Sequence, residues 1–414
     1  MKIERVTAWE VLDSRGNPTV ACEVTVDGGA RGVASVPSGA STGTFEAHEL
    51  RDGGDRYGGK GALRAVANVN GVLGPAIHGF DPSDQAGVDA LLREIDGTPR
   101  LDRLGANALL AVSVAAALAS AAARRLELFD TLGNEPLLPM PMVNIVSGGA
   151  HARGGVDIQD VLAVPVGASS FAEAIEWAAR VRSATADVAS ERGLDVSLVA
   201  DEGGLGPRLD NNRAALELVA AGVERSGLAL GGDAALAVDL AANQFHADGR
   251  YRFDGRDLDA AAVVAEVVSW CDAFPIVSVE DPVADTDDDG WAIASRELGV
   301  QLLGDDLFCT DLARLEAGIA SGTANAVLVK PNQTGTLTGA RRVLERAKGA
   351  GYATVVSARS GETEDGWLAD LAVGWAAGQI KVGSTMRSER TAKWNRLLRI
   401  EAQTGAPFAG WRGR

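Results

Sequence analysis

The sequence predicts an α/β protein in which a small N-terminal α+β domain precedes a larger β/α barrel. Its 414 residues are too many for one ordinary domain and suit a small domain followed by one of barrel size. In the longer C-terminal part, short β-branched apolar runs alternate with helical patterns, as in βα units around a parallel sheet. Three prolines within residues 136–141 interrupt both helix and strand. We therefore expect residues 1–133 to form the first domain and residues 134–414 the second.

The N-terminal domain should begin with strands and continue with helices. Apolar side chains alternate with polar or small ones over residues 20–26, after a turn signal at residues 13–18. Small residues at 38–43 predict a flexible loop, and a helical pattern of apolar residues runs from Leu63 to Ala123. The stretch that ends at Ala123 is the most apolar of the chain. Its Asn and Ser residues, and the two arginines that follow it, favour a buried helix over a membrane span.

Each apolar run of the predicted barrel ends in a polar residue. Most of these run ends are separated by the length of a strand, a helix and two loops. The run ends are Asp239, Glu280, Asp305, Lys330, Arg359 and Lys381. Because the carboxyl ends of barrel strands form one rim that carries the active site, we expect these side chains to lie close together. A doubly wound sheet is the alternative, but no glycine-rich phosphate loop opens this region.

Charge and cysteine content argue against several classes of function. The chain has 39 Lys and Arg against 56 Asp and Glu, and its net charge of -17 repels phosphate backbones and anionic membranes. Neither nucleic acid nor a membrane is therefore an expected partner. The three cysteines lack the spacing of a zinc site or a disulfide framework, and the N-terminus lacks the pattern of a signal peptide. These features favour a cytoplasmic protein.

Three acidic run ends predict a metal site. They are Asp239, Glu280 and Asp305. Converging carboxylates without His or Cys suit a hard cation such as Mg²⁺. The alternative is that each acid only caps the helix that follows it. Three acids at three successive strand ends favour the metal.

Two basic run ends, Lys330 and Lys381, predict a general base. Lysine is rare in this chain, which has six lysines and many arginines. A divalent cation nearby pushes an ammonium towards its neutral form, which can then remove a proton next to a metal-bound carboxylate. The alternative is a pair of structural salt bridges with the same acids. Arg359 stays charged and suits the binding of phosphate or carboxylate, with the Ser360 hydroxyl beside it.

Three further segments carry weaker signals. Glu202 follows an apolar run and is a candidate for the acid that protonates a leaving hydroxyl. His151 lies in a loop that is too rich in glycine for core packing, which favours a substrate-facing histidine over one in the core. The aspartates within residues 285–289 lack the spacing of an EF-hand loop, so we expect a solvated turn there.

Three motifs resemble those of the enolase family. They are DSRGNPT at residues 13–19, VPSGASTG at residues 36–43 and RSERTAK at residues 387–393. Motifs this long are highly specific, and the likeness covers nearly the whole chain. The resemblance implies an enolase-type modified (β/α)8 barrel, a TIM barrel whose first strands are not all parallel, beneath an N-terminal α+β lid domain. It also implies a Mg²⁺-dependent hydro-lyase, a carbon-oxygen lyase that dehydrates 2-phosphoglycerate to phosphoenolpyruvate.

The resemblance implies two Mg²⁺ ions, the second arriving with the substrate. The ligands of the first ion, which holds the substrate carboxylate, would be Asp239, Glu280 and Asp305. Ser41 lies where the family's lid serine binds the second ion together with the phosphate. Arg359 and Ser360 match the residues that hold the phosphate.

The same resemblance implies roles for the other candidates. Lys330 matches the base that removes the C2 proton, and Lys381 matches the lysine that stabilises the enolate. Glu202 matches the acid that expels the C3 hydroxyl as water. His151 matches a histidine of the second lid loop. Members of the family are usually dimers or larger homo-oligomers.

The chain departs from the family pattern on the side of the leaving group. Ala358 replaces a histidine next to the phosphate-binding arginine, and Asp160 replaces a glutamate that partners Glu202. Residues 150–155 lack the family's aspartate and two asparagines after the histidine, and residues 382–386 are also unlike the family.

These departures predict proton abstraction retained on an altered substrate. Removing an imidazole opens space near the phosphorus group, as a larger group would need. The family includes such enzymes, the carboxyphosphonoenolpyruvate synthases of phosphonate antibiotic biosynthesis, which dehydrate a 2-phosphoglycerate analogue with a carboxyl on phosphorus. An ordinary glycolytic enolase is one alternative. A non-catalytic enolase paralogue that acts as a binding protein is another.

Overall fold

In the computed structural model, which describes residues 1–40, 43–152 and 155–412, the chain begins with an antiparallel meander in the order β1-β2-β3. The strands are β1 (Ile3–Leu12), β2 (Pro18–Val26) and β3 (Arg31–Ser35). The turn between β1 and β2 is closed by Asp13, whose backbone N–H donates to the Asn17 carbonyl at 2.8 Å. The Asp13 carboxylate accepts from the Arg15 and Asn17 backbone N–H groups. The predicted turn and strands are therefore confirmed.

Helices follow the meander, as the apolar pattern predicts. They are η1 (Arg56–Gly59), α1 (Leu63–Asn68), η2 (Val69–Leu73), α2 (Gly74–Ile77), α3 (Gln85–Asp96), α4 (Ala106–Ala123) and η3 (Phe129–Thr131). Among the described residues, α4 alone has the length and hydropathy of a membrane span, and 83% of it is buried. It packs against β2 and β3, so in this structure it is the core helix of the N-terminal domain.

Gly32 lets β3 approach α4 closely. A Cβ at this position would lie 2.2 Å from both the Ala115 carbonyl oxygen and the Ala119 nitrogen, which are backbone atoms that cannot move aside cheaply. We expect Gly32→Ala to lower the free energy of unfolding by about 1–3 kcal/mol or more, measured by the midpoint of urea unfolding. Gly71→Ala is the control, because nothing lies within 4 Å of its added Cβ. Equal midpoints for the two variants would contradict the close approach.

A closed barrel forms the rest of the fold, in the order β10-β11-β12-β13-β14-β4-β5-β6. Its strands are β4 (Met140–Ser147), β5 (Asp160–Val164), β6 (Ala235–Asp239), β10 (Ile276–Glu280), β11 (Gln301–Gly304), β12 (Ala326–Val329), β13 (Ala353–Ser357) and β14 (Gly378–Gly383). β5 is antiparallel to both neighbours, and the other pairs are parallel. The enolase-type modified barrel is therefore confirmed.

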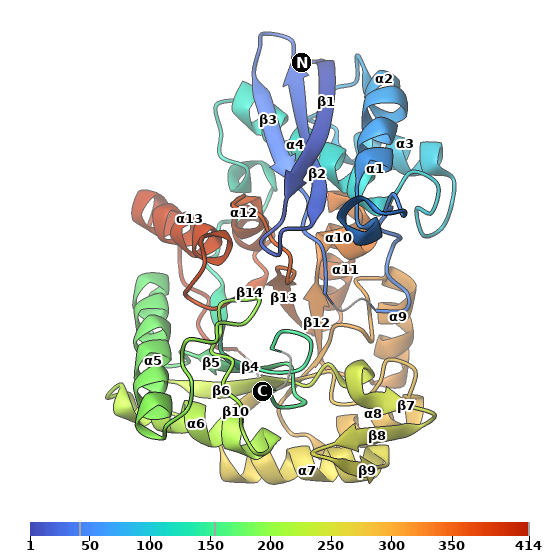
Figure 1. Cartoon of the computed structure of the whole chain (residues 1–414). Helices are drawn as coiled ribbons and strands as arrows, with labels where there is room; N and C mark the ends of the chain where they lie inside the picture. Colours follow the sequence, from blue (N-terminus) through green and yellow to red (C-terminus); the bar gives the residue numbers. More distant parts are fainter. Residues whose placement is uncertain (41–42, 153–154, 413–414) are drawn as a thin grey trace.

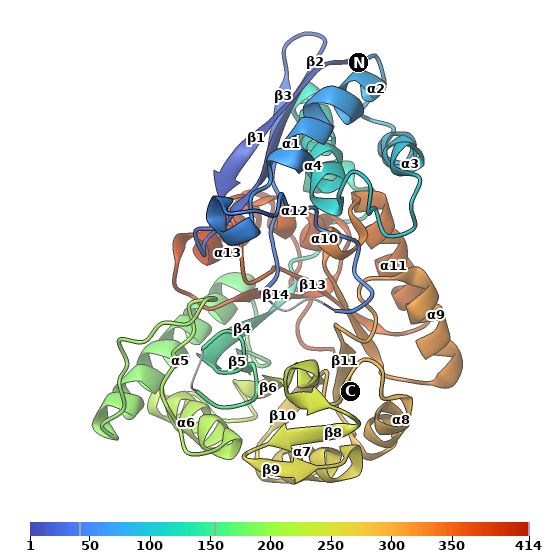
Figure 2. The ribbon, with the colours of Figure 1, turned by 45° about the vertical axis from the view of Figure 1, so that its right-hand side comes forward.

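Helices surround the barrel (Figures 1 and 2). They are α5 (Phe171–Glu191), α6 (Asn212–Arg225), α7 (Ala260–Ala273), α8 (Asp288–Glu297), α9 (Leu312–Ser321), α10 (Pro331–Thr334), α11 (Leu337–Gly349), α12 (Trp367–Gly374) and α13 (Ser388–Thr404). The segment of chain that connects β6 to β10 forms a small separate sheet. Its strands are β7 (His246–Ala247), β8 (Arg250–Phe253) and β9 (Arg256–Leu258). This sheet explains the long interval between the run ends at 239 and 280.

Apolar side chains fill one end of the barrel interior. Met142, Leu162 and Leu328 belong to this buried cluster, and Phe408 and Trp411 of the C-terminal segment pack against it. The solvated turn expected at 285–289 is confirmed only in part. Residues 285 and 286 form a turn and Asp288 and Asp289 are exposed, but residue 285 is buried, and Asp287 caps α8 by accepting from the Gly290 N–H at 2.8 Å.

The N-terminal domain lies over the carboxyl ends of the barrel strands (Figure 1). The Ala40 backbone N–H donates to the Ser360 hydroxyl at 2.6 Å. Ser38 forms a β-bridge with Gly361, just beyond the end of β13. The segment before residue 41 is thus fixed to the rim on which the polar run ends gather.

Candidate active site

The six polar run ends lie at one rim of the barrel, because β6 and β10–β14 run in the same direction. Asp160 joins them from the opposite direction. It is the first residue of β5, and since β5 is antiparallel, its beginning lies at the rim where its neighbours end. Its Cα partners are Ser147, the last residue of β4, and Asp239, the last residue of β6.

Two lysines and three carboxylates meet in the centre of this rim. The Lys381 Nζ lies 2.6 Å from Asp239 Oδ2 and 2.7 Å from Glu280 Oε2. The Lys330 Nζ donates to Asp305. The three carboxylates and Lys381 are buried, and Lys330 is nearly so. The structure thus brings together the predicted ligands and the predicted bases, as ion pairs.

The carboxylates determine the charge of the two lysines. Burial alone would favour the neutral amine, but Asp239 and Glu280 outweigh it and raise the pKa of Lys381 well above its usual value. Asp305 likewise outweighs burial and raises the pKa of Lys330. This direction differs from the one expected for a lysine beside a divalent cation, because a carboxylate is the nearest charge to Lys330 here.

One carboxylate oxygen in this group fits a cation. Glu280 Oε1 is buried and has no hydrogen-bond partner among the described residues. Burial and the neighbouring Asp239 charge raise the pKa of Glu280 well above its usual value. A cation bound here would satisfy this oxygen and favour the carboxylate form, so the donor set, with oxygen ligands only, suits Mg²⁺.

The acidic residues are grouped differently from the predicted ligand set. Among the described residues, Asp305 shares a cluster with Asp281 and Asp306, in which one ligand atom of each lies within 4.8 Å of the others. Asp239 and Glu280 are outside that cluster and pair with Lys381 instead. The sequence reading had not singled out residues 281 and 306, although each directly follows a predicted ligand.

His151, Asp160 and Glu202 form a second group at this rim, where the sequence predicted the leaving-group side. The His151 Nδ1 lies 3.1 Å from Asp160 Oδ2, and its Nε2 lies 3.8 Å from Glu202 Oε1. Asp160 also accepts hydrogen bonds from Ser147 Oγ, at 2.9 Å, and from the Asn144 side chain. His151 is only 7% exposed, so it is more buried than its glycine-rich loop suggested, but it still lines a small cavity at the rim, together with both lysines.

Glu202 lies on a tight turn rather than at the end of a strand. The turn is closed by the Gly203 N–H, which donates to the Ala200 carbonyl at 2.9 Å. Arg182 of α5 donates to the Gly203 carbonyl at 2.9 Å and holds the turn against the barrel. The apolar run before Glu202 is therefore not a barrel strand, unlike the apolar runs that lead to the other candidates at the rim.

The charges in this group favour a protonated histidine. Burial disfavours the imidazolium, but Asp160 and Glu202 outweigh this and raise the pKa of His151 to about 9. Burial would raise the pKa of Glu202, but the positive charges of His151 and Arg390 outweigh it, and this pKa is lowered. The surrounding charges thus favour the imidazolium form of His151 beside the carboxylate form of Glu202.

Arg359, which follows β13, also lies at this rim and is 3% exposed. Its guanidinium donates to Glu46 Oε2 at 2.9 Å and to Asn332 Oδ1 at 3.1 Å. Burial opposes its charge, but Glu46 more than compensates, so the pKa of Arg359 is raised. The Ser360 hydroxyl lies beside it and accepts from Ala40. Ser41, the predicted ligand of a second ion, lies outside the described residues.

Several residues of the site were missed by the sequence reading. Gln333 donates to Asp305 Oδ1 at 3.1 Å, and Gln159 donates to Asp239 Oδ2 at 3.0 Å. Arg390 donates to the Arg359 carbonyl at 2.6 Å. Glu46 pairs with Arg359 from the N-terminal domain. Gln159 directly precedes Asp160, and Gln333 lies three residues after Lys330, so closeness to the candidates was the available signal.

These groups enclose a cavity of about 20 Å³. It is lined by His151, Gln159, Glu202, Lys330, Ser357, Ala358, Arg359, Ser360 and Lys381. This volume is about that of one water molecule, because the ion pairs fill the centre. A substrate must therefore separate these ion pairs when it binds. Ala358, the residue that replaces the family histidine, faces the same cavity as the predicted base and acid.

Family comparisons agree with this geometry. A family model described as "Enolase, N-terminal domain" matches residues 3–132. A second, described as "Enolase, C-terminal TIM barrel domain", matches residues 135–414. Together the two matches cover nearly the whole chain. The chain therefore belongs to the enolase family, and it has the fold of a Mg²⁺-using lyase that acts on small phosphorylated acids.

Proposed function

We propose that the protein is a hydro-lyase that removes the C2 proton and the C3 hydroxyl from a 2-phosphoglycerate-like substrate. Lys330 takes the C2 proton, and Lys381 stabilises the enolate that forms. Arg359 and Ser360 hold the phosphorus oxygens. The convergence of two lysines and three carboxylates at one buried rim carries this proposal, because it supplies a base beside a site for a bound carboxylate.

Asp239, Glu280 and Asp305 would hold the first Mg²⁺, and Ser41 a second that arrives with the substrate. Bound there, Mg²⁺ would supply the positive charge that holds the substrate carboxylate and stabilises the enolate. On the leaving-group side, Glu202 and His151 would deliver the proton that converts the C3 hydroxyl into water. Asp160 would orient the imidazole through its contact with Nδ1.

We propose further that the substrate is a phosphono analogue with a carboxyl on phosphorus, as for carboxyphosphonoenolpyruvate synthases. Ala358 carries this part, because a methyl group lines the cavity next to Arg359 where the family has an imidazole. A second cavity of about 240 Å³ shares Arg359 with it and is also lined by Asn332 and Glu46. It supports the proposal by offering room beside the phosphorus-binding arginine.

The variant Ala358→His tests which of the two substrates the protein prefers. We expect the wild type to turn over the carboxyphosphono analogue with a higher kcat/KM than 2-phosphoglycerate. The imidazole should lower kcat/KM for the larger substrate about 10- to 200-fold, because it removes space and adds a polar group. The smaller substrate should lose less or improve. Steady-state kinetics of both substrates on both proteins gives the answer.

The same kinetics separates the alternatives. A wild-type preference for 2-phosphoglycerate at ordinary rates would identify a glycolytic enolase and reduce Ala358 to a tolerated change. Absence of turnover with both substrates in the presence of Mg²⁺ would favour a non-catalytic binding protein. In either case the role in phosphonate antibiotic biosynthesis would fail.

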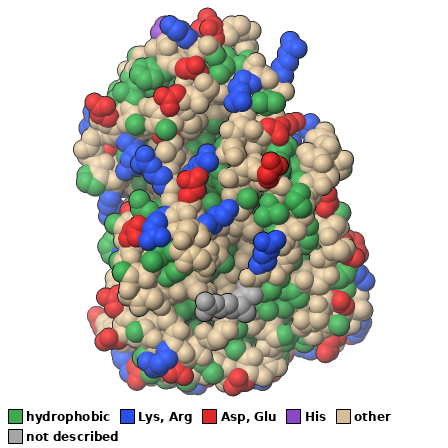
Figure 3. Space-filling model, turned by 180° about the vertical axis from the view of Figure 1, so that it is seen from behind, with side chains coloured by type: hydrophobic (Ala, Val, Ile, Leu, Met, Phe, Trp, Pro, Cys, Tyr) green, Lys and Arg blue, Asp and Glu red, His purple; other side chains and the backbone are tan. Residues whose placement is uncertain are grey.

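Other expectations stay predictions. They are a boundary between residues 133 and 134, a cytoplasmic location, a homo-oligomeric state, and the absence of nucleic acid and membrane partners. The net charge of -17 supports the last of these. On the face opposite to the view of Figure 1, acidic and basic side chains are interspersed (Figure 3).

A further inference from the structure

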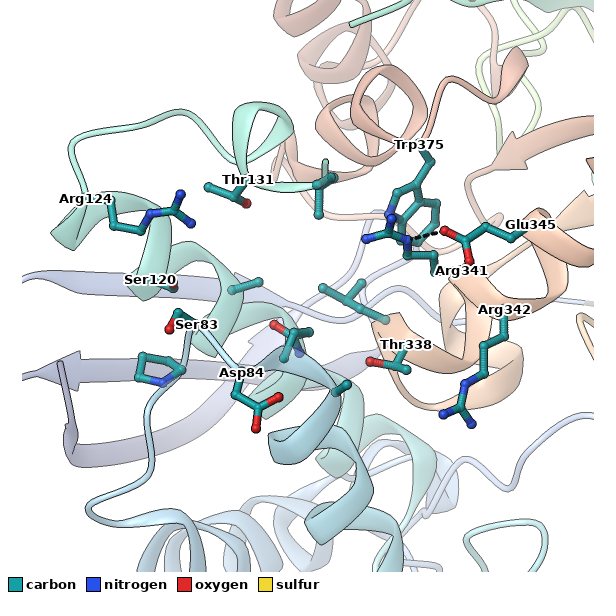
Figure 4. Close-up of a pocket in the computed structure, with 16 residues that line it drawn as sticks. Ser83, Asp84, Ser120, Arg124, Thr131, Thr338, Arg341, Arg342, Glu345 and Trp375 are labelled. Atoms are coloured by element: carbon teal, nitrogen blue, oxygen red, sulfur yellow. Dashed lines mark hydrogen bonds and ion pairs between the residues drawn. The ribbon is translucent and has the colours of Figure 1, made fainter. Parts of the chain in front are cut away.

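A cavity of about 460 Å³ lies between the N-terminal domain and the barrel. Its walls come from α3 and α4 on one side and from α11 and the end of α12 on the other (Figure 4). It shares no lining residue with the catalytic cavity. Its volume lies within the range of about 300–1,000 Å³ that is usual for small-molecule sites.

The charged side chains that line this interdomain cavity are mostly basic, although the chain as a whole is strongly acidic. They are Arg124, Arg341, Arg342, Asp84 and Glu345. Figure 4 shows Arg124 on one wall and Arg341 and Arg342 on the other. Basic groups thus approach the cavity from both domains.

Both acidic side chains of the lining are already engaged. Asp84 caps α3 by accepting from the Gly87 N–H at 2.9 Å, and Glu345 accepts from Arg341 Nε at 2.7 Å. Arg124 and Arg342 have no ion pair or side-chain hydrogen bond within the part of the chain that the structure describes. Both side chains are exposed, so two solvent-accessible guanidinium groups border the cavity, and such groups recognise carboxylate, sulfonate or phosphate oxygens.

The remaining lining combines apolar surface with unsatisfied polar atoms. Ala117, Leu132 and Leu337 supply apolar surface. Trp375 is 1% exposed, and its Nε1 donor has no partner among the described residues. Gln85 Oε1 is likewise buried and unpaired. Both atoms are enclosed by protein, so the apolar surface of this lining is what a ligand would contact.

We propose that the interdomain cavity binds a small organic anion whose apolar body lies against Leu132 and Leu337 and whose acidic group pairs with the guanidinium of Arg124 on one wall or of Arg342 on the other. Such a ligand would contact both domains. At this place the start of α11 is already fixed to the N-terminal domain, because Thr338 N–H donates to Asp89 at 2.8 Å and Leu337 N–H to Ser113 at 3.1 Å.

The probe for this site is 8-anilinonaphthalene-1-sulfonate, a fluorescent aromatic sulfonate that matches the proposed chemistry. Fluorescence titration of the full chain should show saturable binding. The double variant Arg124→Ser/Arg342→Ser should bind it at least about tenfold more weakly, since each lost contact to a charged group is worth about 1.5–3 kcal/mol. The control variant Arg192→Ser/Arg252→Ser removes the same charge from exposed positions outside the cavity and should bind as the wild type does.

A neutral probe separates anion recognition from apolar binding. N-phenyl-1-naphthylamine has the same aromatic body without the sulfonate, so it should bind the wild type more weakly and should respond little to loss of the two arginines. Equal affinity of the two probes, or equal affinity of the wild type and the Arg124/Arg342 variant for the sulfonate, would overturn the proposal. Failure of the wild type to bind the sulfonate saturably would overturn it as well.

Discussion

Replacing Lys330 by alanine should stop the exchange of the substrate's C2 hydrogen with solvent. The reason is geometric, since the Lys330 amine lies at the centre of the rim and lines the cavity that Glu202 and Lys381 also line. A general base contributes about 10²–10⁴-fold to its step, so exchange should fall by about that factor. Incorporation of deuterium at C2 in D₂O, followed by NMR or mass spectrometry, measures the step directly, without requiring dehydration.

Glu202→Gln gives the matched comparison. It should abolish dehydration but leave C2 exchange measurable, because Glu202 acts on the leaving hydroxyl and lies on a different segment from the base. Lys348→Ala removes a lysine outside the cavity, whose Nζ donates to the Ala376 carbonyl at 2.9 Å, and should change neither step. If exchange persisted in Lys330→Ala and disappeared in Lys381→Ala, the base would be Lys381 instead.

The rim was predictable because several barrel strands are short apolar runs with an abrupt polar end. Asp239 and Glu280 end their strands, and Asp305 directly follows one, as the pattern predicted. Such a pattern indicates strand ends because a parallel strand that is buried on both faces is mostly apolar, so a charged residue is most easily accommodated where the strand leaves the sheet. The α4 helix was predictable for a similar reason, since a helix that is apolar on all sides must be covered.

The reversed direction of β5 could not be predicted from its own residues. An apolar run reads the same in either orientation, and only the enolase resemblance indicated that the first strands are not all parallel. The reversal decides the position of Asp160, which reaches the rim from the start of its strand rather than from the end. Asp160, whose side chain is one methylene shorter than the glutamate of the family, contacts His151, which lies nine positions earlier on the preceding loop.

Contacts between the two domains were also beyond the sequence pattern. Glu46 and Arg359 are separated by 313 positions, yet they form a buried ion pair with an N–O distance of 2.9 Å. Nothing local marks Glu46 as a partner of Arg359. The pairing arises because the N-terminal domain covers the rim, so that its carboxylate neutralises a guanidinium that burial would otherwise disfavour.

Asp305→Asn should abolish Mg²⁺-dependent turnover. The amide preserves the shape of the side chain and removes its charge, so a cation held by Asp239, Glu280 and Asp305 would lose one of three charged ligands. A metal contributes several kcal/mol of charge stabilisation in such reactions, so kcat/KM should fall by about 10³-fold or more. Turnover of the wild type should also cease in excess chelator and return when Mg²⁺ is added back. Calorimetric titration with Mg²⁺ should show weaker binding by the variant than by the wild type.

The variant Asp306→Asn is the matched comparison for Asp305→Asn. Asp306 belongs to the cluster with Asp281 and Asp305 but is not one of the predicted ligands. Its carboxylate accepts from the Asn243 side chain at 2.9 Å, a contact that an asparagine can keep in part. We expect it to lose much less activity and Mg²⁺ affinity than Asp305→Asn. If Asp306→Asn abolished Mg²⁺ binding while Asp305→Asn retained it, the cation would belong to the cluster of residues 281, 305 and 306, and the ligand set at the strand ends would be wrong. Undiminished turnover of the wild type in chelator would remove the metal from the reaction altogether.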